Sequence, residues 1–293
     1  MTGAFAGSGT TVPVRRGPAP GRGPAGSAYL LPRQPDPTRA PLRLFCFHHA
    51  GGAASSFSGW QERLGGGVAV VPVQLPGREH RVKEPRLRDF ARLVDELDEA
   101  LDPLLEAPYA FYGHSMGGIV AHELTRRRVE RGLTPPRQLL VGACPPPHRP
   151  HLGDGVPPER RTDEELTAWM AGLGGLPELV RRYPEWLRLA VAVLRDDLSL
   201  VHSHSHGHGH GHSHGSGAGA AAVLEPLPVP VRALAGSSDP LVPPRLAAEW
   251  GRHTTADFRV FTLAGGHFFH RSAPGIVLRL VASLLAAERT ARS

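Results

Sequence analysis

The stretch "FYGHSMGGIV", residues 111 to 120, decides the fold of this chain. An apolar run ends at Gly113 and a run with helical spacing follows Ser115, so the serine lies in a turn between a strand and a helix. In a Gly-x-Ser-x-Gly turn the serine is strained, and side chains at the flanking positions would collide with neighbouring backbone. Gly113 and Gly117 meet this requirement. The stretch therefore predicts a nucleophile elbow with Ser115 as the nucleophile; a turn that only packs is the alternative.

Two backbone amides are candidates to stabilise negative charge beside this serine. The N–H of Met116 lies at the start of the predicted helix, where an anion is favoured. The second donor should come from the loop "FHHAGGAASSF", residues 47 to 57, in which Gly51 and Gly52 leave the backbone accessible. We expect the Ala50 N–H to be this oxyanion donor; a plain glycine turn is the alternative.

A serine hydroxyl needs a base, and the base needs an acid that fixes its tautomer. In the fold that contains such an elbow, the α/β-hydrolase fold, the acid and then the histidine follow the serine along the chain. Asp239 in "LAGSSDPLVP" comes just beyond a predicted strand, and His267 in "FTLAGGHFFH" comes after the next one. The sequence predicts Ser115, Asp239 and His267 as a catalytic triad. For Asp239, a turn-forming role is the alternative.

Other reactive side chains receive weaker assignments. His270 is the second candidate for the base, and His114, next to the serine, is expected to pack or to orient a neighbour. Cys46 and Cys144 lie in apolar runs without the spacing of a zinc site or a redox pair, which predicts buried free thiols. No cofactor and no metal site is predicted.

The chain of 293 residues, 41% hydrophobic, is long enough for one large domain. Residues 41–289 alternate short apolar runs with amphipathic ones, which predicts a mostly parallel central sheet flanked by helices. Residues 1–40, rich in Gly, Pro and Arg, predict a flexible tail. An insertion at about 145–200 carries a possible capping box, Thr162 with Glu165. We interpret it as a helical lid over an acyl channel; an ordinary helical subdomain is the alternative.

A tract of alternating histidine and glycine, "HSHSHGHGHGHSHGSGAGA", begins at His202. Such a segment buries little apolar area, so residues 202–222 are expected to form a loop. A repeat in a tolerant surface loop is the preferred interpretation, and loose binding of zinc, nickel or copper is the alternative.

The formal net charge of +6 comes from arginine, because Lys83 is the only lysine. Such a bias often reflects a GC-rich genome, and no nucleic-acid-binding motif accompanies the charge. A basic face that favours an acidic protein partner is the alternative. No stretch reaches the roughly 18 apolar residues of a membrane span, and the N-terminus makes a poor signal peptide. We therefore expect a soluble cytoplasmic protein that binds neither membrane nor nucleic acid.

With these motifs in order, the sequence resembles the type II thioesterases that accompany polyketide synthases and nonribosomal peptide synthetases. The resemblance covers roughly residues 41 to 289. The motifs that carry it are "HAGG" at 49–52, "FSGW" at 57–60, "QLPGREHR" at 74–81, "YGHSMGG" at 112–118, "LRDDLSL" at 194–200, "GSSDPLV" at 236–242 and "GGHFF" at 265–269.

The resemblance implies an α/β-hydrolase that frees acyl groups from the phosphopantetheine thiol of an acyl or peptidyl carrier protein. It implies that the enzyme clears misprimed or stalled modules, acts as a monomer, and uses Ser115, Asp239 and His267. Two departures stand out: His48 replaces a proline that the family usually has, and the His-Gly tract replaces a short ordered segment.

Three other functions share these residues. A carboxylester hydrolase would prefer oxygen esters, and a chain-terminating thioesterase would prefer medium-length acyl chains. A non-catalytic module would bind a carrier protein or buffer metal through the histidine tract. Substrate comparisons separate the first two, and activity that depends on the serine separates the third.

Overall fold

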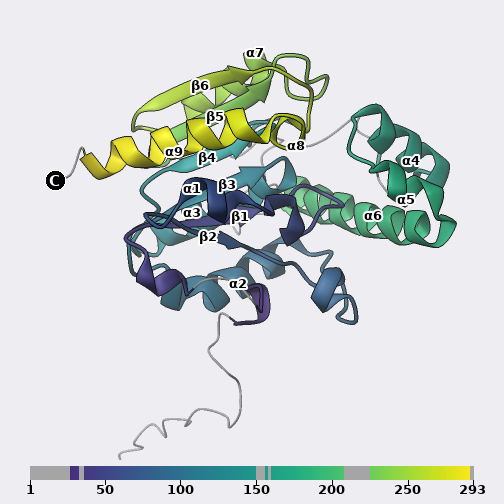
Figure 1. Cartoon of the computed structure of the whole chain (residues 1–293), viewed down its shortest axis with the longest axis horizontal. Coiled ribbons are helices and arrows are strands. Elements are labelled where there is room, and N and C mark those ends of the chain that lie inside the picture. The colour runs from purple at the N-terminus through teal and green to yellow at the C-terminus, as the bar shows by residue number, and fades with distance from the viewer. Residues whose placement is uncertain (1–26, 33–35, 150–155, 158–159, 208–224, 291–293) are drawn as a thin grey trace, which may run out of the picture.

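The computed structural model describes residues 27–32, 36–149, 156–157, 160–207 and 225–290. A six-stranded parallel sheet in the order β2-β1-β3-β4-β5-β6 forms its centre (Figure 1). The strands are β1 Arg43–Phe47, β2 Ala69–Pro72, β3 Tyr109–His114, β4 Leu139–Gly142, β5 Val231–Gly236 and β6 Phe258–Leu263. The expectation of a mostly parallel sheet flanked by helices is confirmed.

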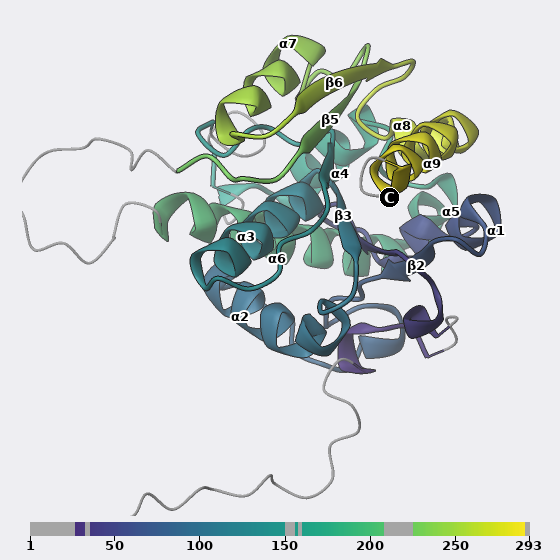
Figure 2. The ribbon, with the colours of Figure 1, turned by 90° about the vertical axis from the view of Figure 1, so that its left-hand side faces the viewer.

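Helices cover both faces of the sheet (Figures 1 and 2). The α-helices are α1 Trp60–Leu64, α2 Phe90–Leu101, α3 Met116–Glu130, α4 Asp163–Gly172, α5 Glu178–Arg182, α6 Pro184–Gly207, α7 Pro244–Ala247, α8 Phe269–Ser272 and α9 Pro274–Thr290. The 3-10 turns are η1 Ser27–Tyr29, η2 Pro37–Arg39, η3 Ala54–Phe57, η4 Glu79–Arg81, η5 Asp102–Leu104 and η7 Ala248–His253.

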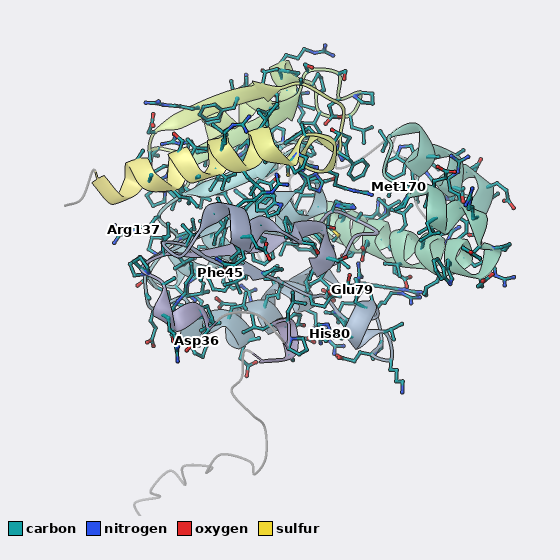
Figure 3. All side chains as sticks on the ribbon, in the orientation of Figure 1. Asp36, Phe45, Glu79, His80, Arg137 and Met170 are labelled. Atoms are coloured by element: carbon teal, nitrogen blue, oxygen red, sulfur yellow. The ribbon has the colours of Figure 1, made fainter. Side chains whose placement is uncertain are left out.

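Successive strand residues point to opposite faces, so each strand feeds two hydrophobic cores. Phe45 of β1, which lies near the middle of the molecule in Figure 3, packs in the core that α2 and α3 cover. Its neighbour Cys46 packs in the second core, beside α1 and α9. Cys46 and Cys144 are buried free thiols, as predicted.

The ends of the strands position the functional loops. Phe47, the last residue of β1, pairs with Gly113, and His114, the last residue of β3, pairs with Gly142. In parallel sheets the carboxyl ends of neighbouring strands lie at one edge, where ligands bind. The loops after β1, β3, β5 and β6 therefore meet at that edge.

Helices α4, α5 and α6 lie between β4 and β5 in the chain and stand beside the sheet at one end of the molecule (Figure 1). The Thr162 side chain accepts a hydrogen bond from the Glu165 N–H, and the Glu165 carboxylate accepts one from the Thr162 N–H. The predicted capping box at the start of α4 is thus confirmed. We call α4 to α6 the lid, after the predicted lid insertion to which they belong.

The prediction of a loop from His202 is wrong for its first residues, because α6 continues to Gly207. The Ser203 hydroxyl oxygen accepts the first amide hydrogen of α2, from Phe90, at 3.1 Å. The His204 ring packs on Phe90 with centroids 4.3 Å apart. These tertiary contacts outweigh the low helical preference of a His-Gly sequence. The predicted loop from residue 208 to 222 lies outside the described residues.

The folded part also begins before the predicted boundary at residue 41. Tyr29 is 4% exposed, its hydroxyl donates to Glu96, and the Arg81 guanidinium lies 4.3 Å from the centre of its ring. One aromatic ring can bury a large apolar area, which explains the ordering of a short segment in a sequence rich in Gly and Pro. The predicted tail up to residue 26 lies outside the described part of the chain.

Candidate active site

Ser115 forms the sharp turn between β3 and α3. Its backbone has φ 53° and ψ −118°, a combination that non-glycine residues rarely adopt. The Ser115 N–H donates to the Gly142 carbonyl at 2.8 Å, which ties the turn to β4. Strain of this kind persists only where the surrounding structure enforces it, and it is concentrated at functional sites.

The two glycines beside the serine are required by close backbone contacts. A Cβ on Gly113 would lie 2.1 Å from the Gly117 carbonyl oxygen. A Cβ on Gly117 would lie 2.0 Å from the Phe47 carbonyl oxygen, at the end of β1. The glycines therefore let the first turn of α3 approach both β3 and β1, as the motif predicts.

The structure brings Ser115, His267 and Asp239 into one hydrogen-bonded chain. His267 Nε2 lies 3.1 Å from Ser115 Oγ, and His267 Nδ1 lies 2.9 Å from Asp239 Oδ2. All three residues are buried. The geometry is that of a nucleophile, a base and an acid that orients the base.

Asp239 is held by the turn after β5 as well as by the histidine. Its Oδ1 accepts the N–H groups of Leu241 and Val242, so the turn-forming role and the pairing with His267 coexist. Burial raises the pKa of Asp239, but the hydrogen bonds and charge of His267 and the two amides outweigh it and lower the pKa. An ionised Asp239 favours a proton on His267 Nδ1, which leaves Nε2 free to accept from the serine.

His114 contacts the backbone of the candidate base. Its Nε2 lies 2.8 Å from the His267 carbonyl oxygen, and its Nδ1 lies 3.1 Å from the Tyr112 hydroxyl. Burial and the nearby His267 lower the pKa of His114 to about 3, so the ring is neutral. A carbonyl only accepts, so Nε2 carries the proton and Nδ1 accepts from Tyr112. His114 thus orients the loop that carries His267.

His270, the second candidate base, is not brought to the serine. Its ring lies 3.8 Å from the His114 ring, and within the described residues neither ring nitrogen has a hydrogen-bond partner. Burial lowers the pKa of His270 well below its ordinary value. The geometry therefore favours His267.

The two predicted oxyanion donors lie on segments that touch. The Met116 amide is the first of α3 and has no acceptor within the helix. Ala50 belongs to a β-turn, His49–Gly52, closed by a 2.9 Å bond from the Gly52 N–H to the His49 carbonyl. Gly51 supplies the positive φ, 76°, that such a turn requires at its third position. We call residues 49 to 52 the oxyanion turn.

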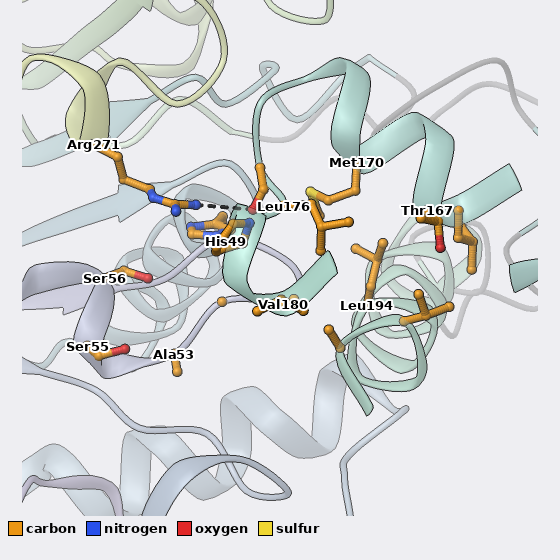
Figure 4. Close-up of a pocket in the computed structure, with 17 residues that line it drawn as sticks. His49, Ala53, Ser55, Ser56, Thr167, Met170, Leu176, Val180, Leu194 and Arg271 are labelled. Carbon is orange, nitrogen blue, oxygen red and sulfur yellow. Dashed lines mark hydrogen bonds between the residues drawn. The ribbon is translucent and has the colours of Figure 1, made fainter. Parts of the chain in front are cut away.

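A cavity of about 280 Å³ lies between this turn and the lid (Figure 4). In Figure 4, polar groups of His49, Ser55, Ser56 and Arg271 lie on one side, and the other side, with Met170 and Leu194, is apolar apart from Thr167. Its lining residues are His49, Gly51, Gly52, Ala53, Ser55, Ser56, Leu166, Thr167, Met170, Gly175, Leu176, Pro177, Val180, Ala190, Val191, Leu194 and Arg271. Because α4, α5 and α6 supply the apolar side, the inserted helices line the cavity as a lid would.

Comparison with known proteins agrees with this geometry. The model of the thioesterase domain family matches residues 42–285. The chain belongs to this family. A curated relative, linear gramicidin dehydrogenase LgrE of Brevibacillus parabrevis, is 32% identical over 249 residues, which cover 84% of this thioesterase and 88% of the relative.

Two solved structures are also similar. RedJ, a thioesterase from the prodiginine biosynthetic pathway in Streptomyces coelicolor, is 34% identical with a TM-score of 0.73, and the match covers 86% of this thioesterase and 93% of RedJ. The type II thioesterase BorB from the borrelidin biosynthetic cluster is 33% identical with a TM-score of 0.69, over 86% and 94%.

LgrE is named a dehydrogenase, and many dehydrogenases bind a dinucleotide through a glycine-rich turn. The turns after the strands of this thioesterase differ from that pattern. Dinucleotide-binding folds place Gly-x-Gly-x-x-Gly between a strand and a helix. Here β1 is followed by His-His-Ala-Gly-Gly and β3 by Ser-Met-Gly-Gly. Neither they nor the segments after the other four described strands carry that pattern.

Sequence reasoning missed the roles of Arg78 and Asp197 in this thioesterase. Both lie in motifs that carry the family resemblance, but no local pattern indicates a partner for either. In the structure they form a buried ion pair at 2.6 and 2.7 Å, and Asp197 also accepts the Gly51 N–H of the oxyanion turn. The available signal was an arginine in "QLPGREHR" and an aspartate in "LRDDLSL", two opposite charges separated by 119 residues.

Among the residues that the structure describes, no group of three or more His, Cys, Asp or Glu side chains is arranged to hold a metal ion. The helices of the same part of the chain include none long and apolar enough to cross a membrane.

Proposed function

We propose that this thioesterase hydrolyses acyl groups from the phosphopantetheine thiol of an acyl or peptidyl carrier protein, and so clears misprimed or stalled biosynthetic modules. The observation that carries the proposal is the hydrogen-bonded chain from Ser115 through His267 to Asp239. The biosynthetic setting is supported by the similarity to RedJ and BorB.

In the first half of the reaction, Ser115 Oγ attacks the thioester carbonyl carbon while His267 Nε2 takes the hydroxyl proton. The Met116 and Ala50 amides then donate to the oxyanion, and Asp239 stabilises the imidazolium. When the carbon–sulfur bond breaks, His267 returns the proton to the pantetheine thiolate. This half-reaction leaves an acyl group on Ser115.

In the second half, His267 takes a proton from water, and the resulting hydroxide attacks the acyl-serine carbonyl. The same two amides stabilise the second oxyanion, and the serine leaves with the proton from His267. Each amide is worth about 100-fold to 1000-fold in turnover in enzymes of this kind.

The lid cavity is the proposed binding site of the acyl chain. Its apolar end, which includes Met170, Val180 and Leu194, suits a hydrocarbon, and a preformed cavity of this kind orients a ligand through a few polar groups. The similarity to BorB, a type II thioesterase, supports an editing role over a chain-terminating one. We further propose a cytoplasmic monomer whose arginine-rich surface attracts an acidic carrier protein.

The test is hydrolysis of acetyl-, propionyl- and longer acyl-carrier proteins beside matched oxygen esters, by wild type and Ser115→Ala. We expect release of acyl groups from the carrier that falls by about 10⁴-fold or more in the variant. Unfolding temperatures measured for both proteins control for loss of structure.

Full activity in a folded Ser115→Ala protein would sink the mechanism. Activity confined to oxygen esters would indicate a carboxylester hydrolase, and activity confined to one chain length would indicate a chain-terminating enzyme. Carrier affinity that stays the same between low and high salt would contradict electrostatic docking.

A further inference from the structure

The ion pair between Arg78 and Asp197 joins the body of the protein to the lid. Asp197 lies on α6, its side chain is 1% exposed, and both of its oxygens accept from the Arg78 guanidinium. Arg78 also donates to the carbonyls of Pro76, at 3.3 Å, and Gly52, at 3.1 Å. A bidentate pair of this kind fixes the orientation of both groups as well as their separation.

This ion pair reaches the oxyanion turn at two points. Asp197 Oδ2 accepts the Gly51 N–H at 2.8 Å, which fixes the central peptide of the turn. Arg78 holds the carbonyl of Gly52, the last residue of the turn. Ala50, whose amide is the proposed second oxyanion donor, lies between His49 and these fixed points. The turn is therefore restrained by α6 and by the segment that carries Arg78.

The segment that carries Arg78 is shaped to point this side chain inward. Gly77 has φ 79°, and a Cβ there would lie 2.0 Å from Arg86 Cγ. Glu79, on the other side of Arg78, has φ 47°. Figure 3 labels Glu79 on the side of the body that faces the lid. Gly77 adopts its positive φ without strain, whereas Glu79 is strained, and strain of this kind persists only where the surrounding contacts enforce it.

Helix α6 also lines the acyl cavity. Ala190, Val191 and Leu194 contribute to the lining, and Asp197 follows Leu194 by three residues, on the same face of the helix. A Cβ on Gly51 would lie 3.4 Å from Leu194 Cδ1, so the helix touches the turn directly. One rigid element thus contacts both the acyl cavity and the oxyanion turn.

We infer that Asp197 and Arg78 are positioning residues for catalysis: they hold the oxyanion turn so that the Ala50 amide points at the developing oxyanion. This inference rests on the proposed thioester hydrolysis. An amide that is misplaced rather than removed loses part of the 100-fold to 1000-fold that such a donor supplies. Loss of the pair should therefore lower kcat by about 10-fold to 100-fold and leave KM within about 3-fold.

The neighbouring residue Asp196 provides a matched control. It lies on the same helix, its side chain is 5% exposed, and it pairs with Arg86 and with Arg88. Among the contacts of the described residues, none joins it to the oxyanion turn. Asp196→Asn should therefore weaken attachment of the lid as Asp197→Asn does, but leave kcat within about 2-fold of wild type.

The experiment measures kcat and KM with an acyl-carrier protein and with a small acyl thioester, for wild type, Asp197→Asn, Asp196→Asn and Arg78→Lys. Arg78→Lys keeps the positive charge but cannot donate to both Asp197 oxygens as the guanidinium does. Its kcat should therefore fall less than that of Asp197→Asn. It also serves as the second variant if Asp197→Asn does not fold.

A second readout is binding of a trifluoromethyl ketone analogue, which forms an oxyanion on the serine. Its affinity should fall in Asp197→Asn by the same factor as kcat/KM, because both depend on the oxyanion donors. Binding of intact acyl-carrier protein by Ser115→Ala should be unchanged when Asp197→Asn is added.

Equal losses of kcat in Asp196→Asn and Asp197→Asn would overturn the inference, as would a higher KM with unchanged kcat. If wild type hydrolyses thioesters and Asp197→Asn has the same kcat, the inference about the ion pair is overturned but the proposed function stands. A wild type that hydrolyses none would refute the proposed function itself.

Discussion

Gly117→Ala adds a single methyl group at the point where α3 meets the end of β1. The new Cβ would lie 2.0 Å from the Phe47 carbonyl oxygen, 2.5 Å from the Phe47 carbonyl carbon and 2.8 Å from the His48 carbonyl oxygen. Nonbonded carbon and oxygen atoms approach to about 3.3 Å. Because all three neighbours are backbone atoms, no side chain can rotate away, and the segments must separate by roughly 1 Å.

Two effects oppose each other in this variant. Alanine has a higher helix propensity than glycine by about 1 kcal/mol. Overpacking of a rigid site costs typically about 1 to 3 kcal/mol, and here the strained turn at Ser115 moves as well. We expect a net loss of up to about 2 kcal/mol in the free energy of unfolding.

The loss of activity should be larger than the loss of stability. Separation of α3 from β1 moves the Met116 amide away from the oxyanion turn, since the two donors sit on the segments that the methyl group pushes apart. A displacement of about 1 Å at a reacting centre costs about 100-fold in rate. We therefore expect kcat for an acyl-carrier protein to fall about 100-fold.

The control is Gly172→Ala in α4, where a new Cβ has no atom within 4 Å. This variant should keep wild-type kcat and equal or slightly higher stability. Chemical unfolding and steady-state hydrolysis are measured for both. Wild-type stability together with wild-type kcat in Gly117→Ala would refute the claim that this close approach holds the site together.

Three further predictions concern the base, the acid and the cavity. Asp239→Asn should lower kcat by about 10³-fold to 10⁴-fold. Because its pKa is lowered in the folded protein, the ionised Asp239 stabilises the fold at pH values above the ordinary aspartate pKa. This contribution disappears as the pH falls through the folded pKa. Between about pH 6 and pH 3, the free energy of unfolding should therefore fall less in Asp239→Asn than in wild type. His270→Phe should keep kcat within about 3-fold of wild type and should not lower the free energy of unfolding, because it replaces a buried imidazole that has no hydrogen-bond partner among the described residues. A large fall in kcat would restore His270 as a candidate base. Val180→Phe narrows the apolar end of the cavity and should lower kcat/KM about 10-fold for long acyl chains but not for acetyl, whereas an equal change at all chain lengths would argue against an acyl site there.

The elbow and the sheet could be predicted because their signals are local. Each strand is a short apolar run in the sequence. The two glycines around Ser115 are required because a Cβ at either position would collide with backbone, which the motif itself predicts. The order of Asp239 and His267 along the chain follows from the fold that the elbow implies. The structure then joins the three residues at hydrogen-bonding distance.

Features that depend on distant contacts could not be predicted in this way. Helix α6 extends into the His-Gly tract because Ser203 and His204 contact α2. No local sequence pattern indicates those contacts. Tyr29 is buried by residues that follow it by more than forty positions. Arg78 and Asp197 were visible as charges, but only the fold shows that they meet.

The lid therefore does more than cover the cavity. Without α6, Arg78 would be a buried cation with no carboxylate partner, and the Gly51 amide would lose its acceptor, so the oxyanion turn would have no restraint from that side. His48 Nδ1 lies 2.9 Å from the His49 carbonyl oxygen, and this hydrogen bond does not involve Gly51 or Gly52. The geometry of the oxyanion turn thus depends on the inserted helix that also lines the proposed acyl cavity.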